Sequence, residues 1–396
     1  MSALSHQGFR AYFLAAIPLV QALWAQRVTI GWLAWDVTGS AAFVGFVAAL
    51  GLAPAIAAGP VFGVLVDRAD IRQALRLTSG SMCALLVLAA LLAGGPGLGP
   101  WGLALIALGI GLITAAHHPV RMSLGPRLVP RADVPNVVAL SALNFNLGRM
   151  IGPLLTGVAI AAFGPVVTLW LSAALYLPML VAVRWMHPRD LGARPPTTVL
   201  GGLGEALSYL ARAPVARQAL LLTFAIAVFV RGYLELLPVM AEGVHGRGAE
   251  GLGLLTAAAG GGALVAALAK TAGVGQGGIS RGTRATLVLG VLGLTALGLS
   301  ASWAAALGWT ALAGFASTFC GVSLQAAVQE DLPDALRGRV MSLWVVVGIG
   351  AVALGSGGLG WFAQGFGLMP VLTWAGVAGG AAACLLALSS PRRTAT

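Results

Sequence analysis

The sequence has very little charge and very few cysteines. Only 9% of its 396 residues are charged and 58% are hydrophobic, with a mean hydropathy of +0.91. Soluble globular domains carry about 25% charged residues, so this composition excludes one. Cys83, Cys320 and Cys384 lie in apolar stretches without metal-ligand spacing, and we interpret them as packing residues rather than redox groups. The chain is therefore predicted to be an integral membrane protein.

Signatures of catalysis are also missing. The sequence contains no HExxH motif and no phosphate-cradling glycine loop followed by lysine. Its serine, histidine and aspartate residues do not have a spacing that supports a catalytic triad. We therefore expect no enzyme activity, no bound metal and no organic cofactor. A channel is not favoured either, because no repeated filter-like segment appears.

What the sequence has instead is a series of long apolar stretches. Each is near 20 residues long and suffices for a hydrocarbon core of about 30 Å. Because lipid cannot hydrogen-bond a bare backbone, each stretch is expected to be helical. The prediction is an all-α membrane protein with twelve transmembrane helices, near residues 11–35, 42–65, 74–94, 101–120, 137–162, 166–186, 217–240, 251–270, 285–300, 303–325, 340–362 and 369–389.

The distribution of basic residues predicts the orientation of these helices. The net charge of +11 would suggest a nucleic-acid partner in a soluble protein. Here 19 of the 23 Lys and Arg residues lie at the termini or in the connections on one side of the membrane. Arg247 alone lies in a connection on the other side. Cytoplasmic loops carry the excess of Lys and Arg, so both termini are predicted to be cytoplasmic. The lipid bilayer, and no nucleic acid, is the expected partner.

One long polar interval divides the spans into six and six. The predicted parts are an N-terminal six-helix bundle at 1–186, a cytoplasmic linker at 187–216 and a C-terminal six-helix bundle at 217–396. In the linker, Leu203, Leu207 and Leu210 lie at i, i+4 and i+7, which predicts a short amphipathic helix on the inner face.

The two halves also resemble each other weakly. An offset of 203 residues pairs Pro130 with Pro333 and Gly152 with Gly355. Six spans in each half give the halves the same orientation, as a parallel repeat requires. The bundles are therefore predicted to be pseudosymmetric.

The turn after the second span resembles a family motif. Gly63, Asp67, Arg68 and Arg72 follow the order G-x-x-x-D-R-x-x-R, with one extra residue before the last Arg. This turn is similar to the loop between the second and third helices of the major facilitator superfamily. The resemblance implies two bundles around a central cavity, alternating access, and an inner-gate role for these four residues. The alternative is a basic loop that only sets topology.

The fifth span carries a second motif. Gly148, Gly152, Pro153 and Gly157 resemble the signature G-x-x-x-G-P-x-x-G-G of facilitator antiporters, with Thr156 in place of the penultimate Gly. In that family the signature accompanies export, so the resemblance implies efflux. The same glycines also make a flat strip for close helix contact.

Two further segments resemble one branch of the superfamily. Residues 24–40 and 332–342 are similar to the first helix and to the loop before the eleventh helix in the bacterial siderophore and macrolide exporters. This resemblance implies a small-molecule substrate, and a monomer in the inner membrane of a bacterium.

Polar residues inside the spans are the candidates for a substrate cavity or for coupling. An Arg at the centre of a spanning helix costs about 3 kcal/mol or more unless it faces water or a partner. A structural Arg that binds carbonyls of a neighbouring helix is the alternative, and His117 and His118 are either titrating groups or a polar helix end. The candidates are Gln26, Arg27, Asn144, Asn146, Arg149, Arg231 and Glu235.

Glu235 is the only carboxylate clearly within a span, one turn from Arg231. Burial raises the pKa of a carboxylate and a nearby cation lowers it, so Glu235 either loads and releases a proton or forms a static pair with Arg231. The expected function is efflux of a hydrophobic or amphipathic small molecule, drug-like or siderophore-like, driven by the proton gradient. The alternative is an uptake or facilitated carrier for a small metabolite with the same fold.

Overall fold

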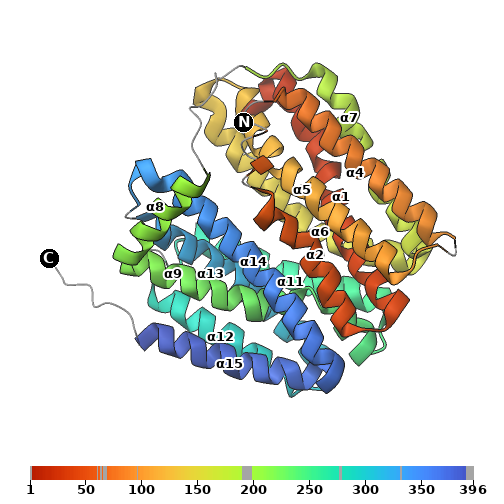
Figure 1. Cartoon of the computed structure of the whole chain (residues 1–396), viewed down its shortest axis with the longest axis vertical. Coiled ribbons are helices and arrows are strands. Elements are labelled where there is room, and N and C mark those ends of the chain that lie inside the picture. Colours follow the sequence, from red (N-terminus) through yellow and green to blue (C-terminus); the bar gives the residue numbers. More distant parts are fainter. Residues whose placement is uncertain are drawn as a thin grey trace. The chain divides into compact units, whose positions relative to one another are not determined.

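A computed structural model describes residues 2–59, 61–62, 65, 69–95, 97–189, 199–275, 279–330 and 332–388. Within these ranges the chain consists of helices and short connections and contains no strand, which confirms the predicted all-α class (Figure 1).

The helices run in the order expected from the apolar stretches. In the first half they are α1 (Gln7–Thr38), α2 (Ala41–Ala57), α4 (Ile71–Ala93), α5 (Pro100–Arg127), α6 (Val134–Ala174) and α7 (Leu177–Ala182). In the second half they are α8 (Val199–Arg212), α9 (Pro214–Ile226), α10 (Gly232–Leu234), α11 (Gly248–Thr271), α12 (Arg281–Gly298), α13 (Trp303–Glu330), α14 (Asp334–Phe366) and α15 (Leu368–Leu388). Two π-helical segments, η4 (Ala227–Arg231) and η5 (Val239–Val244), flank α10.

Nine helical runs in the described ranges are long and apolar enough to cross a membrane. One of them, Arg131–Trp185, contains two of the predicted spans. These two spans meet at Gly164, whose φ of 78° is a conformation that favours glycine. The helix α2 is apolar but has only 17 residues, and α12 begins with two arginines in its first turn. Twelve crossings and cytoplasmic termini stay predictions.

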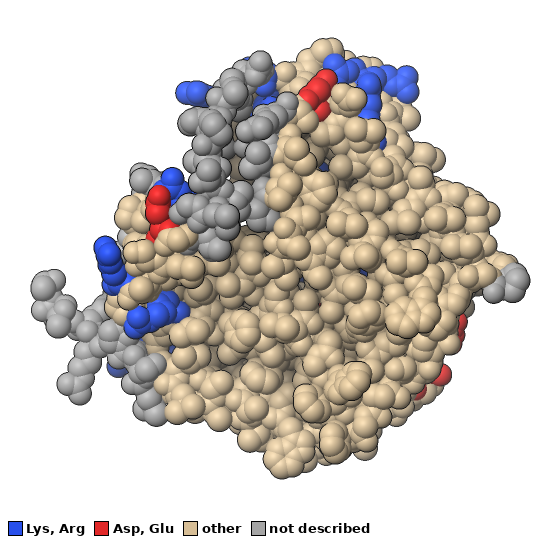
Figure 2. All heavy atoms as spheres, in the orientation of Figure 1, with Lys and Arg blue, Asp and Glu red and all other residues tan. Residues whose placement is uncertain are grey.

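The exposed surface is unusual for its apolar content. Large side chains such as Leu105, Trp361 and Trp374 are about 70% exposed or more. On the face shown in Figure 2, most of the visible surface carries neither acidic nor basic side chains. A contiguous apolar surface of this kind marks contact with another apolar phase, and here that phase is lipid.

The chain forms two compact units, and neither is continuous in sequence. The first comprises Met1–Gly39, Leu50–Pro196 and Arg247–Gly253, and the second comprises Ser40–Ala49, Thr197–Gly246 and Leu254–Thr396. Each unit therefore includes a short segment from the other half of the sequence. The predicted division at residues 187–216 stays a prediction.

Glycines allow the closest helix contacts in each unit. In the first, a Cβ on Gly111 of α5 would lie 2.7 Å from the carbonyl oxygen of Gly51 in α2. In the second, a Cβ on Gly376 of α15 would lie 2.6 Å from the backbone nitrogen of Thr295 in α12. Helices in lipid are held together mainly by such close packing, because the tails around them are as apolar as leucine.

The linker helix is present, but its packing face differs in part from the predicted one. The helix α8 packs against α14, with Ala206 and Leu210 buried, whereas Leu207 is 52% exposed. Glu205 forms an ion pair with Arg339. The small side chain of Ala206 lets the two helices approach. A pattern based on large apolar residues does not detect such small contact residues.

Candidate functional site

The antiporter-like motif lies where α6 packs against α1. A Cβ on Gly152 would lie 2.9 Å from the Cβ atom of Trp24, and one on Gly148 would overlap the side chain of Val20. Asn144, one turn earlier, donates a hydrogen bond of 3.0 Å to the carbonyl oxygen of Ala16. Three residues spaced by one turn therefore fix α6 against α1.

The last glycine of the motif serves a different contact. A Cβ on Gly157 would overlap Gly253 in α11, and one on Gly253 would lie 3.1 Å from the Cα atom of Gly157. Both residues belong to the first unit. Thr156, which stands where the family has glycine, is buried and donates to the carbonyl oxygen of Gly152 at 2.7 Å. The substitution is therefore satisfied inside its own helix.

Pro153 stands between these two contacts and is buried. Proline has no N–H, so the carbonyl of Arg149 loses its usual partner in the helix. The side chain of Arg149 is half-buried. The helix continues through Pro153, since its only non-helical residue is Gly164.

The remaining candidates of the first unit lie in different surroundings. Gln26 is 3% exposed and accepts a hydrogen bond of 3.0 Å from the hydroxyl of Tyr176. Arg27 is exposed, and its guanidinium lies 5.9 Å from the ring centroid of Trp24. Asn146 is exposed and donates to Ala142 of its own helix at 2.9 Å. Gln26 thus contributes to packing, whereas Arg27 and Asn146 present polar atoms at the surface of the unit.

His117 and His118 point in different directions, as adjacent helical residues must. His117 is buried, with Nδ1 2.9 Å from the hydroxyl oxygen of Thr78. Because that hydroxyl can donate to the carbonyl of Ala74 at 2.8 Å, the bond to the histidine is satisfied when Nδ1 carries a proton. Nε2 has no partner among the described residues. A titrating role and a role as a polar helix end both stay predictions for these histidines.

Only one of the four inner-gate candidates lies in the described part of the chain. Gly63, Asp67 and Arg68 lie outside the described residues. Arg72, in the first turn of α4, donates to the carbonyl oxygen of Arg184 at 3.5 Å. Asp70 caps this helix by accepting from the backbone N–H of Arg72 at 2.8 Å. The gate role of the motif stays a prediction.

The second unit holds Arg231 and Glu235. The Arg231 side chain donates to the hydroxyl of Ser317 at 2.8 Å and to its carbonyl at 3.2 Å. A Cβ on Gly321 would lie 2.6 Å from its guanidinium. Ser317 and Gly321 are one turn apart on α13, so together they form a docking place for the guanidinium. Neither residue was predicted from the sequence, although a small-x-x-x-small pair is a sequence signal for close approach.

Glu235 is half-buried and ends the short helix α10. The π-helical segments η4 and η5 end and begin four residues before and after it. Such wide turns are rare and are frequent at functional sites, because they displace side chains from the regular helical positions. The sequence predicts a regular helix here and contains no marker for the change.

Metal binding is not indicated in the described residues. No group of three or more His, Cys, Asp or Glu side chains there lies close enough to hold an ion. The polar groups at hand are amides, hydroxyls, guanidinium groups and one half-buried carboxylate. They suit recognition of a polar or charged group and the transfer of a proton.

A family model matches this chain over residues 1–394, and its description is transmembrane secretion effector, MFS_3. The chain belongs to this family. The resemblance to the major facilitator superfamily is therefore confirmed, and the protein is a transporter of that type rather than an enzyme.

Proteins similar in sequence include two named Enterobactin exporter EntS. The one from Citrobacter koseri is 29% identical over 389 residues, which cover 90% of this chain and 86% of that protein. The one from Shigella boydii is 28% identical over 405 residues, which cover 92% and 90%.

Solved structures support the fold. A mutant of the nucleoside transporter NupG aligns with a TM-score of 0.75 at 12% identity, over 96% of this chain and 99% of that one. A bacterial homologue of the human lysosomal transporter Spinster aligns with a TM-score of 0.73 at 17% identity, over 96% and 95%.

The contact between α6 and α1 generates a test of the motif. Gly148→Ala places a methyl group against Val20, and overpacking of this kind costs about 1–3 kcal/mol. We expect a lower free energy of unfolding in detergent micelles. The double variant Gly148→Ala with Val20→Ala removes the opposing methyl groups and should recover part of the loss.

Gly261→Ala is the matched control, because Gly261 lies in α11 with no atom within 4 Å of an added Cβ. Its free energy of unfolding should be unchanged or slightly higher. Equal destabilisation by Gly148→Ala and Gly261→Ala would show that the α6 to α1 contact has no special role.

Proposed function

We propose that this protein is a secondary active transporter that exports a hydrophobic or amphipathic small molecule in exchange for protons. It acts by alternating access in the cytoplasmic membrane of a bacterium, as a monomer without a bound cofactor. The family match over nearly the whole chain is the observation that carries this proposal. The names of the relatives support export as the direction of transport and a siderophore-like molecule as the substrate.

The packing of α6 is consistent with this mechanism. Its glycines allow close contact with α1 and with the first turns of α11. Helices held together this closely move as one body, and rocking of such rigid bodies is one of the ways in which transporters open and close. We infer that the motif that suggested export from sequence serves to hold this body together.

Glu235 is our candidate for the proton carrier. It is half-buried and close in sequence to Arg231, whose guanidinium Ser317 holds through two hydrogen bonds. A fixed positive group favours the charged carboxylate, and movement of the carboxylate away from it favours the protonated form. Alternating access supplies such a movement, so uptake and release of a proton are linked to it.

An assay of transport direction tests the proposal. Purified protein in liposomes with an acidic lumen should accumulate enterobactin, or another amphipathic molecule of the panel, because protons that leave down their gradient drive substrate inward. Liposomes with an alkaline lumen should not accumulate it. Accumulation only with an alkaline lumen would indicate symport, and equilibration that ignores the gradient would indicate the alternative, a facilitated carrier.

The variant Glu235→Gln tests the coupling residue. An amide cannot carry the proton, so accumulation driven by the gradient should fall at least tenfold, whereas exchange of substrate across the membrane without a gradient should continue. Glu242→Gln is the matched control, since Glu242 is exposed and lies two turns further along the same segment. Full coupling in Glu235→Gln would refute the role of Glu235.

A further inference from the structure

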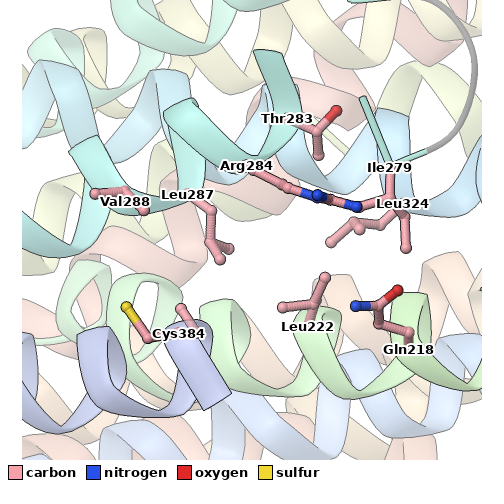
Figure 3. A pocket seen from close by; sticks show the side chains of 10 residues that line it. Gln218, Leu222, Ile279, Thr283, Arg284, Leu287, Val288, Leu324 and Cys384 are labelled. Carbon is pink, nitrogen blue, oxygen red and sulfur yellow. The ribbon is translucent and has the colours of Figure 1, made fainter. Parts of the chain in front are cut away.

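A narrow apolar crevice opens in the second unit among α9, α12, α13 and α15 (Figure 3). Its volume is about 50 Å³. Sites for drug-sized ligands occupy about 300–1,000 Å³, so the crevice is too small for a whole substrate. It is wide enough only for a thin apolar chain. Its walls are mainly the side chains of Leu222, Leu287, Val288 and Leu324.

The crevice lies near the same end of all four helices. Leu222 is in the third turn of α9, and Leu287 is in the second turn of α12. Leu324 and Cys384 lie one to two turns before the ends of α13 and α15. The arginine distribution predicts this end to be cytoplasmic. Its opening therefore lies at the depth where lipid headgroups of the inner leaflet meet their acyl chains.

Arg284 supplies the only cationic side chain among the lining residues. It is exposed, and Figure 3 shows its guanidinium extending toward Ile279 and Leu324. No carboxylate in the described part of the chain pairs with it. It also lies in the first turn of α12, where the helix dipole adds positive potential. With no carboxylate partner among the described residues, this exposed cation at the edge of an apolar slot suits an anion that carries a hydrocarbon chain.

We propose that this crevice binds an anionic phospholipid of the inner leaflet. A short section of one acyl chain lies in the slot between Leu222 and Val288, and the phosphate accepts hydrogen bonds from the guanidinium of Arg284. Guanidinium groups bind phosphate through paired hydrogen bonds, and basic groups at the cytoplasmic surface attract anionic lipids. The site is independent of the substrate and of the proton carrier.

Cys384 provides a direct probe of occupancy. It lines the crevice and is exposed, whereas Cys83 is half-buried and Cys320 is buried. The rate at which a maleimide labels Cys384 is measured in detergent by peptide mass spectrometry, with phosphatidylglycerol or phosphatidylcholine of identical acyl chains added. We expect phosphatidylglycerol to slow the labelling at least fivefold more than phosphatidylcholine. Inorganic phosphate alone should give no protection.

Variants test whether Arg284 causes the preference for phosphatidylglycerol. Arg284→Gln should abolish the difference between the two lipids, and Arg284→Lys should keep most of it. Arg212→Gln makes the same charge change at an exposed site of α8 outside the crevice, so its lipid preference should match the unmodified protein. Equal protection by both lipids, a preference that survives in Arg284→Gln, or protection by inorganic phosphate would each overturn the proposal.

Discussion

The hydrocarbon interior offers no hydrogen-bond partner, and this constraint shapes the whole molecule. Every backbone N–H and C=O in the membrane must be satisfied within the chain, and helices meet this requirement inside each apolar stretch. The same rule applies to side chains. Asn144 and Gln26 both use their amides within the first unit, and Arg231 uses its guanidinium on Ser317. These three polar side chains are therefore held in defined places.

The hydrocarbon interior also determines how helices associate. Lipid removes most of the hydrophobic drive for helices to associate, so close van der Waals contact has to supply the attraction. Glycines make this contact possible in both halves. Gly152 of α6 lies against Trp24, and Gly355 of α14 lies against Val228. Trp24 and Val228 are related by an offset of 204 residues, close to the 203 that pairs Gly152 with Gly355.

A second pair of contacts follows the same pattern. Gly157 of α6 meets Gly253 of α11 inside the first unit, and a Cβ on Gly360 of α14 would lie 3.2 Å from Gly45 of α2 inside the second. Gly157 and Gly360 are again 203 residues apart. The weak sequence repeat therefore marks positions where the backbone of one helix touches another, and such positions tolerate little change.

Long-range patterns in the sequence predicted the all-α membrane class, whereas much of the local geometry was not predictable. Composition and apolar runs were sufficient for the all-α class, because a spanning helix is defined by length and hydropathy. The glycine spacing of the fifth span correctly indicated close packing. The partner of Arg231 on α13 depends on which helices meet, and the π-helical segments near Glu235 have no marker in the sequence. Single-helix periodicity carries no such information.

The orientation predicted from the arginines underlies the proposed export direction and the lipid site. Two matched substitutions in a background without native cysteines test it: Ser302→Cys, in the connection between α12 and α13, and Ser208→Cys, on α8; both serines are exposed. In intact cells, a membrane-impermeant maleimide should label Ser302→Cys and should label Ser208→Cys only after permeabilisation. Labelling of Ser208→Cys in intact cells, with Ser302→Cys protected, would contradict the account.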